Sequence, residues 1–184
     1  MKSQLKLSPE VYSCASAAGY TTITGEESAD GHIEFSAGLG ETRNLVRIDP
    51  DGMVVVNVSE RLEPEYIVFA APAITTIERY LLMTFGSTIR FRNKMPRIRI
   101  PVDKDHLAEG HDLAPVPLRG DDRLALIRTG GQTVAWSRSD PTIATIVLVE
   151  LSYHMTGSYD DIVASYLSAS GAPLYGQFTN RRTN

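Results

Sequence analysis

The chain has 184 residues, of which 42% are hydrophobic and 22% charged, and its formal net charge is −4 at pH 7. This length suits one domain with a proper core, and the mild acidity argues against a nucleic-acid binder, because such domains usually run basic. With one cysteine, no signal-peptide pattern and no apolar window approaching roughly 20 residues, we exclude a disulfide framework and a membrane span and expect a cytoplasmic protein.

The first quarter of the chain predicts a helix followed by a β-hairpin. Ser8 with Pro9 is typical of a helix start, and Gly19 is where that helix should stop. A polar loop at 26–31 precedes residues that alternate between apolar and polar. The sequence Asp-Pro-Asp-Gly at 49–52 is the strongest turn signal in the chain, so 43–58 is expected to form an antiparallel hairpin.

The middle of the chain predicts a central helix between strands. YIVFA at 66–70 is a short apolar strand, and apolar residues at helical spacing predict a helix over about 73–86, ended by Gly86. Beyond it, 89–92 and 97–100 alternate, which favours two strands. Their apolar residues, Phe91 among them, should point inward, and their arginines should share one polar face.

The last third predicts a second hairpin and two more helices. Residues 103–121 are polar and show no period, whereas 123–137 should form a hairpin around the turn at 129–132. Asp140-Pro141 and Ser158 are typical helix starts. We therefore expect an α+β fold: a single domain over 1–184, with a core at about 8–175, a polar tail at 176–184, and a mainly antiparallel sheet packed by about four helices.

The polar segment contains six possible metal ligands, namely Asp103, Asp105, His106, Glu109, His111 and Asp112. A metal-dependent hydrolase built on 103–112 is one alternative function. The spacing of these six residues does not match the H-E-x-x-H motif. It does not match a calcium loop either, because Leu107 stands where an oxygen ligand is needed. A solvated loop is the simpler interpretation. No P-loop, G-x-S-x-G or complete dinucleotide motif occurs, so we expect no catalytic residues, no metal and no cofactor.

A run of bases follows the central helix, although the chain as a whole is acidic. It comprises Arg90, Arg92, Lys94, Arg97 and Arg99. A nucleic-acid-binding module using 90–99 is a second alternative, but such a surface needs aromatic rings for stacking, and Phe91 is expected to point inward. A solvated strand face is the plain interpretation. An interaction surface for another protein is the functional one, because arginine is enriched at interfaces.

Several segments together resemble a known family. YIVFAAP at 66–72, IERY at 77–80, RLAL at 123–126 and GAPL at 171–174 resemble the Imm61 group of bacterial immunity proteins. That group is related to the immunity factors for tuberculosis necrotizing toxin. The resemblance covers most of the chain, and its motifs describe a fold rather than a reaction.

The resemblance implies a non-enzymatic antitoxin that binds a cognate secreted toxin domain 1:1, as a monomer, and blocks its active site inside the producing cell. For the necrotizing-toxin group it implies a toxin that hydrolyses NAD. Arg79 and Arg90 belong to the shared pattern, so we expect them to be structural and paired with acids. An acidic loop suits an electropositive cofactor cleft, so 103–112 ranks first as contact surface, before 26–31 and 92–99. The expected contact residues are Asp103, Asp105, His106, Glu109, Asp112, Arg92, Lys94, Arg97 and Arg99.

Overall fold

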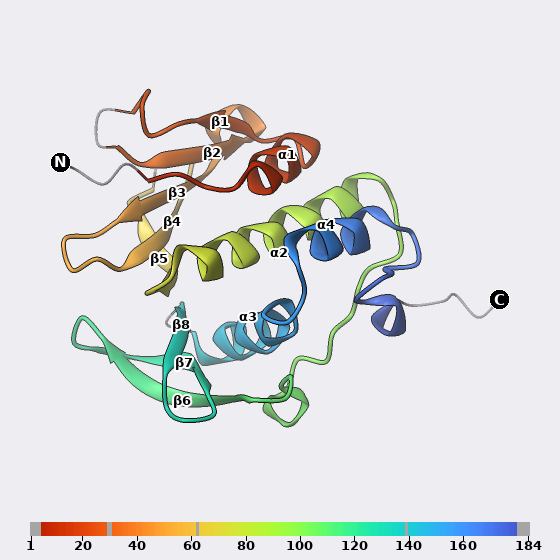
Figure 1. Cartoon of the computed structure of the whole chain (residues 1–184). Coiled ribbons are helices and arrows are strands. Elements are labelled where there is room, and N and C mark those ends of the chain that lie inside the picture. The colour runs from red at the N-terminus through yellow and green to blue at the C-terminus, as the bar shows by residue number, and fades with distance from the viewer. Residues whose placement is uncertain (1–4, 29–30, 62, 139, 180–184) are drawn as a thin grey trace.

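The computed structural model describes residues 5–28, 31–61, 63–138 and 140–179, and over these residues it forms one α+β domain (Figure 1). Eight antiparallel strands make a single sheet in the order β1-β2-β3-β4-β5-β8-β7-β6. The strands are β1 (Thr21–Ile23), β2 (Ile33–Ala37), β3 (Thr42–Ile48), β4 (Val54–Glu60), β5 (Tyr66–Ala71), β6 (His111–Leu118), β7 (Asp121–Arg128) and β8 (Thr133–Ser137). The expected fold class, an antiparallel sheet packed by four helices, is confirmed.

The helices of the described chain lie mainly along one side of this sheet. They are α1 (Pro9–Ala17), α2 (Ile74–Arg92), α3 (Pro141–His154) and α4 (Tyr159–Leu167), with short 3-10 turns η1 (Gly38–Gly40), η2 (Lys104–His106) and η3 (Gly176–Phe178). None of the helices in the described part combines the length and apolar content that a membrane crossing requires.

Both predicted hairpins form, and for the expected local reason. At the first turn, Gly52 takes a φ of +83° and its N–H donates to the carbonyl of Asp49 at 2.8 Å. The N–H of Met53 donates to the carboxylate of Asp51 at 3.0 Å. At the second turn, Gly131 has a φ of +88° and donates to the carbonyl of Arg128. Turn chemistry alone therefore fixed the pairing of β3 with β4 and of β7 with β8.

Strand β6 occupies residues that the sequence left without structure. Pro115 and Pro117 interrupt the pattern, yet Pro115 pairs with Leu124 and Pro117 with Asp122 in the ladder with β7. Proline has no N–H to donate, so it is tolerated in a strand only where one edge is free. β6 is the last strand of the sheet. The edge position explains both the strand and the missing signal.

Helix α2 crosses the centre of the molecule and continues past its predicted end (Figure 1). Its buried face includes Leu81 and Phe85, both at most 1% exposed, and Phe85 packs edge-on against Phe35 of β2 with ring centroids 5.0 Å apart. Gly86 does not end the helix, so that prediction is wrong. The strand predicted at 89–92 is also wrong, because these residues form the last turn of α2.

A second, smaller group of buried side chains lies on the face of the sheet opposite the main core. Val55, Leu118 and Trp136 are each at most 8% exposed and form a small cluster away from the main core. Val55 lies on β4 and Leu118 on β6, which are separated by three strands in the sheet order, so the sheet must curl to join them. An ion pair between Arg119 and Asp49 links the turn between β6 and β7 to the turn at 49–52.

Candidate functional site

The candidate site is built on the strap, our name for residues 93–102, which leads from the end of α2 to η2. Its start is fixed by α2, since the N–H of Met95 donates to the carbonyl of Arg90 at 2.9 Å. Its centre is fixed by the C-terminal segment: Ile98 forms an isolated bridge with Thr179, and the N–H of Arg99 donates to the carbonyl of Phe178 at 2.7 Å. The predicted strand at 97–100 is thus wrong, and only one bridge forms.

Arg90 is the internal support of this region. Its side chain is 2% exposed, and its guanidinium donates to the carbonyl of Pro96 on the strap at 2.8 Å. The same group donates to four carbonyls at the end of α4, those of Ser165, Tyr166, Ser168 and Ala169. Those carbonyls form the negative end of the helix dipole, which favours a cation. Arg90 therefore ties α2, α4 and the strap together.

Arg79 has a comparable role at the other end of α4. Its guanidinium donates to the carbonyls of His154 and Gly157, the latter at 2.6 Å, and lies 5.2 Å from the ring centroid of Tyr159. The expectation that Arg79 and Arg90 are structural is confirmed. Their expected pairing with acids is wrong, because in both cases backbone carbonyls accept the hydrogen bonds, at a helix end and in a neighbouring connection.

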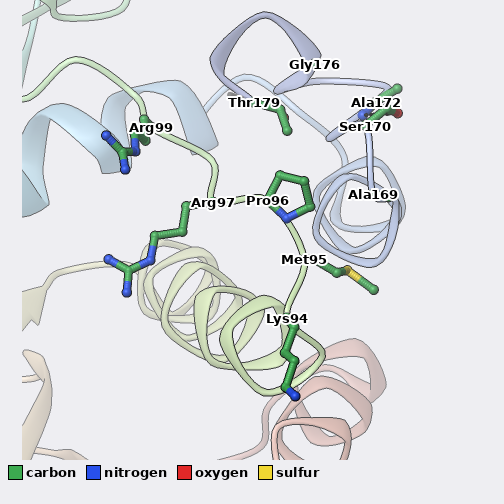
Figure 2. A pocket seen from close by; sticks show the side chains of 10 residues that line it. All are labelled: Lys94, Met95, Pro96, Arg97, Arg99, Ala169, Ser170, Ala172, Gly176 and Thr179. Carbon is green, nitrogen blue, oxygen red and sulfur yellow. Dashed lines mark hydrogen bonds between the residues drawn. The ribbon is translucent and has the colours of Figure 1, made fainter. Parts of the chain in front are cut away.

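The remaining bases of the run divide into two groups. Arg92 donates to the carbonyl of Ala18 at 2.6 Å, so its side chain secures the end of α1. Lys94, Arg97 and Arg99 are exposed, and within the described residues none has an ion pair or a side-chain hydrogen bond. Figure 2 shows Arg97 and Arg99 extending to one side of the strap. The strap thus exposes unpaired cationic side chains, while hydrogen bonds from Arg90 and to Phe178 hold its backbone.

Ile98 and Ile100 alternate with these arginines and anchor the strap. Ile100 is 6% exposed and belongs to the main core, against which Ile98 also packs. The predicted alternation of arginines with isoleucines is therefore correct over 97–100, although the segment is not part of the sheet. Because the isoleucines fill inward positions, the neighbouring arginines must point outward.

Phe91 is a member of this surface that the sequence analysis missed. We expected it to point inward, but its side chain is 70% exposed, the largest value among the large hydrophobic residues of the described chain. The error arose because residues 89–92 were predicted as a strand, whereas they belong to helix α2. In a strand Phe91 would share a face with buried Ile89, whereas in a helix adjacent residues are far apart around the axis. A hollow of about 200 Å³ separates Phe91 from Arg97, with Tyr166 at its base.

A larger hollow of about 990 Å³ lies between the strap and the C-terminal segment (Figure 2). Lys94, Arg97 and Arg99 are among its lining residues, but Lys94 points away from the two arginines, and none of the three charged ends points toward the segment at 169–179. Much of the remaining lining is apolar, including Met95, Pro96 and Ala172. Cationic groups that diverge do not form a pocket for one small anion. The arrangement suits an extended contact surface.

The acidic segment, our name for residues 103–112, begins where the strap ends. Asp103 accepts from the N–H of Asp105 at 3.2 Å and faces Nδ1 of His106 at 2.5 Å. The hydrogen bond from His106 holds the pKa of Asp103 below its usual value. Tyr153 of α3 donates to the carbonyl of His106 at 2.8 Å. This part of the segment is therefore a short ordered turn rather than an irregular loop.

The other acidic residues are spread over that turn, the loop after it and the start of β6. Asp105, Glu109 and Asp112 are exposed, and Asp112 already belongs to β6. Over the residues that the structure describes, no three His, Cys, Asp or Glu side chains come together as a metal site. Of the third predicted contact loop, 26–31, residues 29 and 30 lie outside the described residues. Glu27 accepts from the N–H of Thr24 at 2.8 Å.

Comparison with known proteins gives a consistent result. The family model described as Immunity protein 61 matches residues 14–174. The immunity factor for TNT of Mycobacterium tuberculosis (strain H37Rv) is 31% identical over 170 residues, which is 92% of each chain, and the Mycobacterium bovis homolog gives the same values. The solved structure of Rv3902c from M. tuberculosis has a TM-score of 0.84 and 29% identity, covering 95% of this chain and 97% of that chain.

Proposed function

Because the chain belongs to the immunity protein 61 family, we propose that it is an antitoxin, which binds a cognate secreted toxin domain inside the producing cell and blocks its active site. The observation that carries this function is the 31% identity, over 92% of both chains, to a protein named as the immunity factor for TNT. The confirmed fold adds support, since the matched segments include both hairpins and all of α2, α3 and α4.

The proposed mechanism is occlusion without any chemistry by this chain. An inhibitor that covers an active site needs a rigid surface of standard size, roughly 1,200–2,000 Å² in total, with a few strong anchors. The exposed side chains of the strap and of the acidic segment meet this need, since both segments are held by backbone contacts. We propose the nine expected residues as the contact set. Four of the nine already have a partner within the fold: Arg92 at the end of α1, Asp103 and His106 with each other, and Asp112 with the N–H of Leu113.

The proposed partner is a toxin that degrades NAD, acting in the cytoplasm where the antitoxin must already be present. The resemblance to the immunity factors for necrotizing toxin implies this chemistry, and the relatives are named as immunity factors for TNT. A monomer that binds the toxin 1:1 is the simplest arrangement compatible with occlusion. Arg90 and Arg92 donate hydrogen bonds to backbone carbonyls of the fold and are not available to phosphates, which weakens the nucleic-acid alternative.

Co-expression with the cognate toxin domain tests the proposal. Bacteria producing the toxin alone should stop growing and lose cellular NAD, and this chain should restore both. As a matched control, a helix-disrupting Leu81→Pro variant should restore neither. If the toxin kills equally well with and without the intact chain, the antitoxin function is wrong. If growth is rescued but the toxin alone leaves NAD unchanged, only the proposed toxin chemistry is wrong.

A further inference from the structure

The exposed aromatic ring of Phe91 requires an explanation that the fold does not provide. The chain otherwise buries its large side chains well, and Phe35, Phe69 and Phe85 are all 0% exposed. The next most exposed large hydrophobic residues, Val102 and Leu167, are at 49%, against 70% for Phe91. Covering such a ring removes apolar surface from water and stabilises the covered state. A ring left open in the free protein is therefore suited to a bound partner.

The backbone that presents Arg97 and Arg99 is held in place before any partner binds. Arg97 lines the same hollow as Phe91, and Arg99 follows it on the strap. The bonds from Arg90 to Pro96 and from Arg99 to Phe178 hold the backbone on both sides. A partner would then order the side chains only, which reduces the entropic cost of binding. Arginine and aromatic residues are also the usual anchors of protein interfaces.

The hollows along the strap form one continuous surface. The hollow of about 200 Å³ beside Phe91 and a second one of about 500 Å³ share Arg97 and Ile98. The second hollow extends to Val102, which is 49% exposed. An extended segment of a partner could therefore lie along the strap from Phe91 to Val102.

The charge of this surface selects the kind of partner. Lys94, Arg97 and Arg99 lie within six residues and have no carboxylate partner in the described chain, although the chain has 22 acidic residues against 18 basic ones. Other arginines do have such partners, as Arg47 has Glu65 and Arg119 has Asp49. Free cations on an acidic protein favour a partner segment that supplies carboxylates. A nucleic acid would add phosphates to a chain of net charge −4, and only one ring is available for stacking.

We infer that Phe91, Arg97 and Arg99 form the anchor for the toxin, and that they receive an acidic loop of the toxin domain whose carboxylates meet the two arginines and whose apolar side chain covers Phe91. This inference rests on the proposed function and specifies the contact. It places the acidic segment outside the centre of the interface, contrary to the ranking from sequence.

Binding of the purified chain to a catalytically inactive cognate toxin domain tests the inference by titration calorimetry. Phe91→Ala and the double variant Arg97→Glu, Arg99→Glu should each weaken binding by at least about 30-fold, as expected for anchor residues. The matched controls are Ile48→Ala, another exposed apolar residue, and Arg128→Glu, another exposed arginine. Both should stay within about 3-fold, as residues outside an interface do. Thermal unfolding verifies that every variant is folded.

A charge exchange identifies the partner segment. Lysine substitutions in the acidic loop of the toxin should restore binding to the Arg97→Glu, Arg99→Glu variant and not to the wild type. If the wild type binds toxin and the Phe91 and arginine variants bind equally well, the inference is wrong and the proposed function stands. If the wild type does not bind toxin, both fail. If a fluorescent single-stranded oligonucleotide binds at 150 mM salt and loses affinity in these variants while toxin binding does not change, the surface serves nucleic acid instead.

Discussion

Gly86 of α2 lies directly against the ring of Tyr166 of α4. A Cβ added at Gly86 would be 2.2 Å from Cγ of that ring, and 2.4 and 2.6 Å from its two Cδ atoms. Tyr166 is 1% exposed, and its hydroxyl faces Nε2 of His154 at 2.8 Å, so the ring has little freedom to move. The glycine is therefore needed for the close approach of two helices.

Gly86→Ala should destabilise the protein. Alanine gains about 1 kcal/mol of helix propensity, but overpacking against a fixed ring costs about 1–3 kcal/mol and occasionally more. With three ring atoms inside the clash distance, we expect the loss to exceed the gain, which urea unfolding would detect. The exposed position Ala164 on α4 provides the control: Ala164→Gly should cost about 1 kcal/mol through propensity alone. A more stable Gly86→Ala variant would contradict the packing described here.

Arg90→Ala should be among the most destabilising single changes in the chain. It removes a buried cation and leaves five carbonyls without their donor, and hydrogen bonds to charged groups contribute about 1.5–3 kcal/mol each before relaxation. We expect a loss of about 3 kcal/mol or more in urea unfolding. Arg90→Lys keeps the charge but loses the planar guanidinium, so its stability should lie between those of Arg90→Ala and the wild type. Arg97→Ala, a base with no partner in the described chain, should change stability by less than about 0.5 kcal/mol.

The stability of the protein should depend on pH through two groups with opposite effects. His154 is fully buried and its Nδ1 faces the carbonyl of Glu150 at 2.8 Å; burial lowers its pKa from 6.5 to about 4. Burial raises the pKa of Glu150 from 4.5 to about 7. Between pH 4 and 6.5 the unfolded chain binds the proton of His154, so stability rises with pH. Between pH 4.5 and 7 the folded chain binds the proton of Glu150, so stability falls with pH.

These two slopes, each about 1.4 kcal/mol per pH unit at most, should largely cancel between about pH 4.5 and 6.5. Glu150→Gln removes one of them. Relative to the wild type, this variant should lose stability as the pH is lowered through that window, because only the His154 effect then remains. Urea unfolding of both proteins at three pH values measures the difference, in which all other titrating groups cancel. Parallel curves for the two proteins would contradict the opposed titration.

Toxin binding should depend on salt in its association rate. Two free arginines and a lysine facing an acidic loop accelerate encounter, and salt screens this effect. Raising the salt from 50 to 300 mM should slow association by about tenfold and change dissociation much less. The Arg97→Glu, Arg99→Glu variant should lack this dependence. Stopped-flow fluorescence gives both rates, and equal salt slopes for variant and wild type would argue against steering by the strap.

Neutralising the acidic segment separates the two proposed contact surfaces. A variant combining Asp105→Asn, Glu109→Gln and Asp112→Asn removes three exposed charges, so stability should change by less than about 0.5 kcal/mol per site. If the strap holds the anchor, toxin affinity should stay within about 3-fold of the wild type. A loss as large as that of Phe91→Ala would instead place the acidic segment at the centre of the interface.

The features that depend only on neighbouring residues were predicted correctly from the sequence. The Asp-Pro-Asp-Gly turn at 49–52 and the two glycines before Gln132 produced the two hairpins as predicted. The helix starts were equally local, since Asp140 accepts from the N–H of Ile143 at 2.9 Å and Ser158 from that of Asp161 at 3.1 Å. In each case the hydrogen bond that forms the turn or the helix cap spans three or four residues. A short stretch of sequence is therefore enough to predict it.

The features that depend on residues far apart in the chain became apparent only in the folded protein. Gly86 is a helix-ending residue by propensity, yet it lies inside α2, where the ring of Tyr166, 80 positions later, leaves no room for a side chain. Once α2 continues to Arg92, Arg90 is directed to the carbonyls of α4 in place of the expected acidic partner, and Phe91 is directed to solvent, contrary to its prediction. Pro115 and Pro117 form a strand because β6 is at an edge, which no local pattern reveals. Local propensities amount to about 1 kcal/mol per residue, whereas long-range burial and packing contribute several. The candidate site lies where local propensity and long-range packing favour different structures, so it could not be predicted from the sequence.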